Sequence, residues 1–506
     1  MGLDRSNGRG PEEDGAMTTA VSELDAFNWE PQPAAQALLN ELVDRFLSMS
    51  PWSAGLKERM RAETATRFFD WIDHLGVPNV RGIAERLREV GFVEAEREGV
   101  GRDRGDSVLM VHPGALFPEV VLHHEAVLSV GIKVDSVVEF ASSHLVGQDA
   151  ELLGAPGSRL RMLRACRDEP ASGEPTAENP AAELWAVERH GSNGYEPGEF
   201  DPGLAMKVAQ HREAIIRRDR DYQPLTGDYS VGGESDRLAF ENLNRILDRA
   251  IADLGVDRTC ELFFEGERIY WERSNKAAQI QHLRQNRLGL GWANHDHHTY
   301  RVSRANYTDV IGVFEKLGFD CRERFYAGEE AGWGAQVLEQ PRVGIVIFAD
   351  VDMSAEELTG DFAHEGFEAR DGFSTVGMWV ALHGEAIHQA GMHHLECMFD
   401  HAALREQLRE EAGIETMDPF TEFPYLRQAF TEGEMFTVSP GRIDHLLRSG
   451  AIDESQASRF REQGALGSHL ENLERNDGFK GFNQQGVSDI ISRTDPRKQK
   501  AVAGPA

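Results

Sequence analysis

The stretch Asn294–Arg301 reads Asn-His-Asp-His-His-Thr-Tyr-Arg and brings three imidazoles, a carboxylate and a guanidinium close together. From His298 onward the residues alternate as they do in a β-strand. Alternate side chains of a strand share a face, so His297 and Arg301 point to the same side. His298 points to the other side. The spacing therefore favours His297 over His298 as the partner of Arg301 in a site.

A helix and three strands are predicted after this stretch. Apolar residues with helical spacing run from Tyr307 to Leu317, and Gly318 is well placed to end the helix. Strands are predicted over residues 321–325, 333–338 and 342–350, the last being an apolar run typical of a buried strand. The order from His295 to Met353 is therefore βαβββ.

A second region, Thr375 to Arg475, has a comparable order. We expect a helix over 375–388, a strand over 391–399 that contains His393 and His394, and a helix over 402–412 that ends at Gly413. A strand and turn over 434–440, a helical insertion over 443–460 and a last strand over 467–475 complete the region.

The preceding half of the chain has a weaker pattern. We assign residues 1–20 to a disordered lead-in and 21–167 to an N-terminal α/β region. Helices are predicted there over 35–47, 66–72 and 79–90, and strands over 107–111, 119–123 and 128–134. A helix followed by strands is compatible with a degenerate βαβββ module. This half could be a degenerate module pair that shapes the pocket or an oligomerisation region, and the sequence leaves the oligomeric state open.

The boundaries of the regions after residue 167 are assigned from composition and hydrophobic periodicity. Residues 168–201 are rich in Pro, Gly, Glu and Ser and are predicted to be a linker or long loop. Residues 202–293 form a mostly helical connection, with helices over 202–218 and 237–254 and a β-hairpin over 261–271. Residues 294–490 form the catalytic domain, and 491–506 a tail.

The charge, hydropathy and cysteine content of the chain limit the molecules that it is expected to bind. The formal net charge of −32 argues against nucleic acid, whose phosphates require a basic surface. No run approaches the roughly 18 apolar residues of a membrane span, and no secretion signal is seen. The four cysteines are isolated from one another, as in proteins of a reducing interior, so we expect a cytoplasmic protein without membrane or nucleic-acid partners. The acidic, Lys-poor composition fits either a salt-rich cytoplasm or a GC-rich genome.

Three motifs, in order, resemble the 2-oxoadipate dioxygenase/decarboxylase family of the vicinal-oxygen-chelate superfamily. The first is Asp296–Arg301, followed by Leu317-Gly318-Phe319 and the apolar strand ending at Ile347-Phe348. The second is the Gly-led stretch with His393-His394, where the family has Asn-His. The third is Gly467–Arg475, which is similar to a Gly-Ser-Tyr-Ile-Glu-Phe-Ala-Glu-Arg segment. The resemblance covers residues 294–475.

The resemblance implies an α+β fold in which paired βαβββ modules form a curved mixed sheet. It also implies an Fe(II) ion held by His297, His394 and Glu471. Two histidines and a carboxylate leave open positions that a 2-oxo acid and O2 can fill. Arg301 is then the catalytic residue that anchors the substrate carboxylate, because a guanidinium binds carboxylates in pairs of hydrogen bonds. The implied reaction turns a 2-oxo acid such as 2-oxoadipate into a shortened 2-hydroxy acid.

Several alternatives stay open at this level. His295, His298 or His393 could be ligands in place of their neighbours, and Gln484 could replace Glu471. Arg301 could instead form a salt bridge with an acidic neighbour. The chain could be another vicinal-oxygen-chelate metalloenzyme, an extradiol-type dioxygenase or an isomerase, or a binding protein without catalysis.

Overall fold

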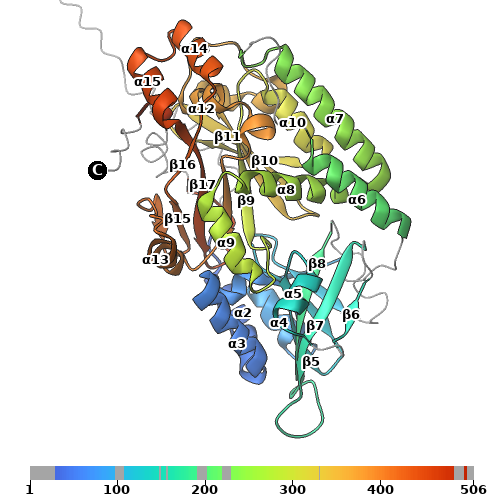
Figure 1. Cartoon of the computed structure of the whole chain (residues 1–506). Helices are drawn as coiled ribbons and strands as arrows, with labels where there is room; N and C mark the ends of the chain where they lie inside the picture. Colours follow the sequence, from blue (N-terminus) through green and yellow to red (C-terminus); the bar gives the residue numbers. More distant parts are fainter. Residues whose placement is uncertain are drawn as a thin grey trace, which may run out of the picture.

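The computed structural model describes residues 29–96, 107–146, 150–154, 158–190, 202–218, 229–329, 331–483 and 495–498. The predicted lead-in 1–20, Gln484 and most of the predicted tail lie outside these residues. Two curved mixed β-sheets, one in each half of the chain, are covered by helices (Figure 1). The predicted α+β fold of βαβββ modules is confirmed.

The C-terminal sheet contains two modules side by side. The first is made of β9 (His295–Arg301), α10 (Tyr307–Lys316), β10 (Asp320–Tyr326), β11 (Trp333–Gln340) and β12 (Ile345–Asp352). The second is made of β13 (His394–Met398), α13 (His401–Ala412), β14 (Thr421–Phe423), β15 (Leu426–Phe430) and β17 (Ala465–Arg475). Their strands join in the order β10-β11-β12-β9-β13-β17-β15-β14. The first strands of the two modules, β9 and β13, therefore meet at the centre.

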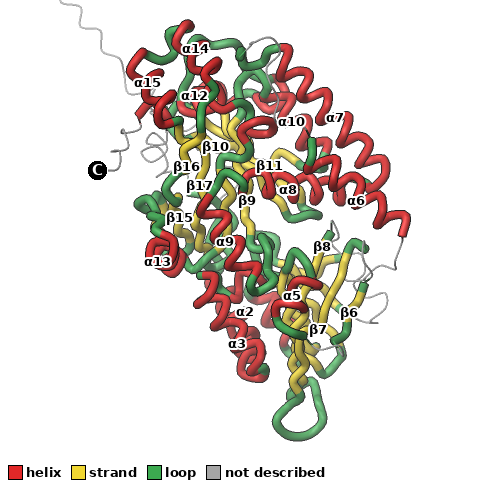
Figure 2. The backbone as a smooth tube through the Cα atoms, viewed as in Figure 1, coloured by secondary structure: helices red, strands yellow, loops and turns green. Residues whose placement is uncertain are grey.

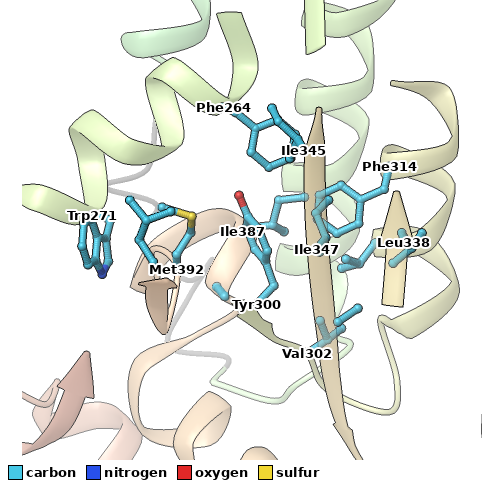
Figure 3. Close-up of a cluster of buried hydrophobic side chains, with 14 of the residues drawn as sticks. Phe264, Trp271, Tyr300, Val302, Phe314, Leu338, Ile345, Ile347, Ile387 and Met392 are labelled. Atoms are coloured by element: carbon cyan, nitrogen blue, oxygen red, sulfur yellow. The ribbon is translucent and has the colours of Figure 1, made fainter. Parts of the chain in front are cut away.

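An apolar core covers one face of this sheet. Tyr300 and Ile347 from the central strands contact Phe314 of α10 and Phe264 of α8 (Val256–Glu272), as Figure 3 shows. The Tyr300 hydroxyl donates a hydrogen bond of 2.9 Å to Glu267, which removes the cost of burying it. Burial of one such side chain contributes about 1.5–3 kcal/mol. The residues that alternate with Tyr300 on β9, His297, Thr299 and Arg301, are thereby directed to the opposite face.

The N-terminal sheet is built in the same way. Its first module is β1 (Ile72–Pro78), α4 (Ile83–Glu89), β2 (Val93–Ala95), β3 (Val108–Val111) and β4 (Glu119–His123). Its second is β5 (Val127–Lys133), α5 (Val137–Ser143), β6 (Leu152–Leu153), β7 (Leu160–Asp168) and β8 (Ala181–Arg189). The strand order is β2-β3-β4-β1-β5-β8-β7-β6. This half therefore contains a complete pair of modules.

The predicted linker over 168–201 was wrong for its middle part. Residues 181–189 form β8, which pairs with β5 on one side and β7 on the other. The first eight residues of β8, Ala181 to Glu188, are all buried. The turn residues before the strand dominated the local composition, whereas burial between two strands is a tertiary property.

The predicted hairpin over 261–271 was also wrong, because these residues lie within α8. Cys260, Phe263, Phe264 and Trp271 are buried and recur at helical spacing. Gly266, which resembled a turn residue, is needed for close packing. A Cβ there would lie 3.2 Å from a side-chain carbon of Ile215 in α6 (Pro202–Ile216).

The helix predicted over residues 66–72 was also wrong. The preceding helix, α3 (Pro51–Thr64), ends at Ala65, whose φ is 53°. Phe68–Trp71 then form a single 3-10 turn before β1 begins at Ile72. Because β1 pairs with both β4 and β5, its backbone hydrogen bonds are made in the sheet rather than along a helix. The helix predicted over 375–388 likewise ends early, as α12 (Thr375–His383).

The other helices surround these sheets (Figure 2). They are α2 (Pro33–Met49), α7 (Glu234–Leu254), α9 (Lys276–Asn286), α11 (Phe362–Glu365), α14 (Pro440–Arg448) and α15 (Glu454–Gln463). Between β15 and α14, the short β16 (Glu434–Phe436) pairs with β17. No described helix is long and apolar enough to cross a membrane.

Candidate metal centre

The three predicted ligands meet on the concave face of the C-terminal sheet. His297 lies on β9, His394 begins β13 and Glu471 lies on β17, three strands that are adjacent in the sheet. The Oε2 atom of Glu471 lies 3.0 Å from Nε2 of His394 and 4.0 Å from Nε2 of His297. All three side chains are buried. The structure thus gathers three donor atoms around one point.

Neighbouring groups hold the outer atoms of these side chains. The Nδ1 atom of His297 contacts the carboxylate of Glu396. The Nδ1 atom of His394 lies 2.9 Å from Nδ1 of His393. Gln428 donates through Nε2 to Oε1 of Glu471 at 3.3 Å. With the outer atoms occupied, Nε2 of each histidine and Oε2 of Glu471 are the atoms left to converge.

The charges of the three groups suit a divalent cation. Burial lowers the pKa of His394 to about 3, with Arg301 adding to the shift, and burial also lowers the pKa of His297. Burial raises the pKa of Glu471 to about 7, although His297 opposes this shift. Metal ligands must be neutral imidazoles and ionised carboxylates. The two histidines already satisfy this condition, and a cation would stabilise the buried carboxylate of Glu471.

The spacing of these donor atoms fits a transition metal. Ligand atoms about 2.1 Å from an ion, at right angles, lie about 3 Å from one another. The contact between His394 and Glu471 already has this length, and the more distant His297 needs only a small adjustment. Two imidazoles and a carboxylate on one side of an ion form the donor set of non-haem Fe(II) oxygenases.

A second group of potential ligands shares His297 but uses its outer nitrogen. It consists of Asp296, His297 and Glu396. Asp296 is already held by Arg475, which donates to its two oxygens at 2.9 and 3.0 Å. This group is therefore better understood as support for His297.

Arg301 lies in the same cavity. It follows Thr299 by two residues on β9, so the two side chains lie on the same face of the sheet. Its guanidinium lies over the ring of Trp379, 5.6 Å from the ring centre. Burial lowers the pKa of Arg301 to about 10, and Asp350 opposes this shift. The side chain therefore stays charged at neutral pH. The structure places the predicted anchor beside the predicted ligands.

Asp350 is a residue of the cavity that sequence reasoning missed. Asp350 on β12 pairs in register with Arg301 on β9. It is therefore the acidic residue with which Arg301 could form a salt bridge, the alternative to binding substrate. Burial raises the pKa of Asp350 well above its usual range, against the effect of Arg301. The alternation Val346-Phe348-Asp350 could have placed this carboxyl on the concave face. Glu396 and Gln428 carried no comparable local signal.

Aromatic side chains form the remaining walls. The cavity, of about 60 Å³, is lined by Phe325, Trp333, Phe348, Phe420, Phe430 and Phe482. A volume of this size accommodates a few water-sized groups. The apolar walls exclude bulk water and strengthen electrostatic interactions within the cavity.

Two of the three alternative histidine ligands, His295 and His298, do not line the cavity. His298 faces the core, with its ring 4.9 Å from that of Phe264. His295 lies within 3.0 Å of the Trp292 carbonyl through Nδ1. His393 does line the cavity, but its Nδ1 atom lies 2.9 Å from Nδ1 of His394, and it does not belong to the group of converging ligand atoms. Among the described residues, the geometry favours His297 and His394, while Gln484 lies outside the described part of the chain.

Comparison of the sequence with protein-family models and with curated proteins gives no match. Solved structures to which this chain is similar include a mutant of 4-hydroxymandelate synthase from Streptomyces coelicolor, at 12% identity and a TM-score of 0.23, covering 84% of this chain and 98% of that one. Another is a putative glyoxalase superfamily protein from Ralstonia eutropha JMP134, at 10% identity and a TM-score of 0.27, covering 54% and 92%. Methylmalonyl-CoA epimerase from Mycobacterium tuberculosis matches at 13% identity and a TM-score of 0.21, covering 36% and 88%.

Of these proteins, one is described as a putative glyoxalase superfamily protein. Their identities and TM-scores are too low to transfer a reaction, a substrate or a metal. The interpretation of the centre therefore depends on the chain's own side chains.

Proposed function

We propose that this protein is an Fe(II)-dependent dioxygenase that decarboxylates and hydroxylates a 2-oxo acid, of which 2-oxoadipate is the first candidate. The observation that carries the proposal is the convergence of His297 Nε2, His394 Nε2 and Glu471 Oε2 beside the charged Arg301. The resemblance of the three motifs to the 2-oxoadipate family supplies the substrate class.

Each protein group has a distinct role in this proposal. His297, His394 and Glu471 would hold the ion, and a bound ferrous ion would supply the redox chemistry with O2 and chelation of the oxo acid. Arg301 would bind a substrate carboxylate and orient the chain toward the ion. The aromatic walls would keep water from the reacting groups.

A second candidate is a vicinal-oxygen-chelate isomerase or epimerase that uses another divalent metal. Two histidines and a carboxylate also bind Zn²⁺ or Mn²⁺, so the donor set alone does not select iron. The buried cation Arg301 favours an anionic substrate in either case.

The test is to purify the protein without air, measure bound metals, and screen 2-oxo acids of different lengths for O2 uptake. We expect iron to support uptake coupled one-to-one to CO2 release. Substrate turnover without O2 would favour the isomerase. Binding of oxo acids without turnover, with any metal, would leave only a binding protein.

A further inference from the structure

A second cavity, of about 380 Å³, lies between the two halves of the molecule. Residues of the N-terminal sheet and the C-terminal sheet both line it, and Phe482 lines this cavity as well as the metal-site cavity. Its volume is within the range of small-molecule sites, about 300–1,000 Å³. None of the proposed metal ligands lines it.

Beside five acidic residues, Asp70, Asp73, Glu119, Asp296 and Glu339, six cationic side chains line this cavity. They are Lys133, Arg189, Arg322, Arg342, Arg475 and Lys480. Five of them have carboxylate partners. Arg189 binds Asp73 at 2.7 Å, and Arg475 binds Asp296 at 2.9 Å. Arg322 and Lys480 share Glu339, at 3.1 and 3.4 Å, and Arg342 lies 3.4 Å from Asp257.

Lys133 differs from the other five. It is the last residue of β5, and among the described residues no carboxylate lies within 4.0 Å of its ammonium group. The acidic groups that act on its charge are Asp73, Asp70 and Asp296. Each of these carboxylates already binds an arginine. Asp70 pairs with Arg67 at 2.7 Å, and Asp73 and Asp296 form the pairs described above. Burial lowers the pKa of Lys133, and those carboxylates only partly oppose the shift.

Apart from the charged residues, Gln36 and His295, the lining is apolar. It includes Phe69, Phe117, Val343, Met398, Phe479 and Phe482. A ligand with an apolar body could displace water from these walls, while its charged group would meet the ammonium of Lys133. An inorganic anion could pair with the ammonium of Lys133 but would make no apolar contact with the lining.

We propose that this interdomain cavity is a second ligand site, which binds a small carboxylate with an aromatic or alkyl body through Lys133. The site is separate from the metal centre and does not depend on the proposed reaction. Since both halves line it, an occupant would contact both module pairs at once.

The experiment measures binding of benzoate, hexanoate, benzamide and inorganic phosphate to the full chain by calorimetry. We expect the two carboxylates to bind, and benzamide and phosphate to bind at least tenfold more weakly. Lys133→Met should weaken benzoate binding at least tenfold, and Lys133→Arg should retain most of it. Lys57→Met changes an exposed lysine on α3 and should leave binding unaltered.

A metal-site variant separates this proposal from the proposed function. Benzoate should bind His394→Ala as tightly as the unaltered chain, because His394 does not line the second cavity. Loss of binding in that variant would place the carboxylate at the metal centre and overturn the proposal. Equal binding by Lys133→Met, equal binding of benzamide, or no carboxylate binding in the millimolar range would also overturn it.

Discussion

The two halves of this protein have the same arrangement of strands but different concave faces. In both sheets the central strand pair contains a β-bulge at the same place. Ile72 pairs with Ile132 and His74 with Gly131, just as His295 pairs with Cys397 and His297 with Glu396. The bulge provides a common register for comparing the two sheets residue by residue.

In this register the metal ligands have different counterparts in the N-terminal half. His74 corresponds to His297, but Ser129 corresponds to His394 and Trp185 to Glu471. The indole of Trp185 donates to Glu183 at 3.0 Å. No group of three potential ligands converges in the described part of this half.

The support for the ligand is also missing in the N-terminal half. Gly131 corresponds to Glu396, the residue that contacts His297 in the C-terminal sheet. A Cβ atom at Gly131 would lie 2.5 Å from a ring atom of His74. His74 instead pairs with Asp73 at 2.7 Å. The comparison teaches that the shared backbone positions a strand pair, whereas a few side chains decide whether it can bind a metal.

The largest expected effect is loss of metal. His297→Ala and His394→Ala should each reduce bound metal to near zero, because two remaining ligands hold an ion poorly. His74→Ala removes the corresponding imidazole of the other half and should leave metal content unchanged. Metal analysis after anaerobic purification measures all three. Loss of metal from His74→Ala would contradict the assignment of the site to the C-terminal half.

Arg301→Gln should retain the metal and lower kcat/KM for 2-oxo acids by about 100-fold, since it removes a buried charge that binds the substrate. The corresponding N-terminal residue is Pro78, which offers no charge. Arg217→Gln, at an exposed position directly after α6, serves as a control. Asp350→Asn distinguishes the alternatives. If Arg301 served only to pair with Asp350, both variants would lose stability and turnover together.

Glu396→Gly reproduces the N-terminal arrangement within the C-terminal sheet. We expect metal affinity to fall by about 10–100-fold, because His297 loses the carboxylate that orients its ring. Competition with a metal chelator measures the affinity. Glu396→Gln, which keeps a hydrogen-bond acceptor for Nδ1, should restore much of it. An unchanged affinity in Glu396→Gly would show that the contact does not position His297.

The smallest expected effect concerns a contact between the halves. His190 lies 2.6 Å from Glu188 of β8 and 2.6 Å from Glu261 of α8. Burial opposes its charge, but the two carboxylates raise the pKa of His190 to about 9. Because this is above the value of 6.5 for the unfolded chain, the stabilisation is complete below pH 6.5 and is lost as the pH rises through 9.

His190→Gln should therefore lower the free energy of unfolding by about 1–3 kcal/mol at pH 6 and by much less near pH 9.5. Urea unfolding at both pH values measures the difference. His211→Gln, which removes a histidine bound to Asp253 within the helical connection, is the matched control. A pH-independent loss in His190→Gln would mean that packing, and not charge, is what the residue contributes.

Much of the C-terminal half could be predicted from the sequence, because its information is local. The four-residue spacing of His297 and Arg301 predicted their shared face, and Gly318 and Gly413 marked helix ends. The order of helices and strands followed from periodicity. The convergence of Glu471 with the histidines came from the resemblance, since no local pattern relates β17 to β9.

Tertiary structure alone decided the rest. Burial between two neighbouring strands made residues 181–189 a strand, and packing against α6 made 256–272 a helix despite Gly266. Glu396, Gln428 and Asp350 joined the site because sheet register brought their strands beside β9 and β17. Periodicity determines which face of an element a side chain occupies, but only the pairing of distant strands determines what that side chain meets.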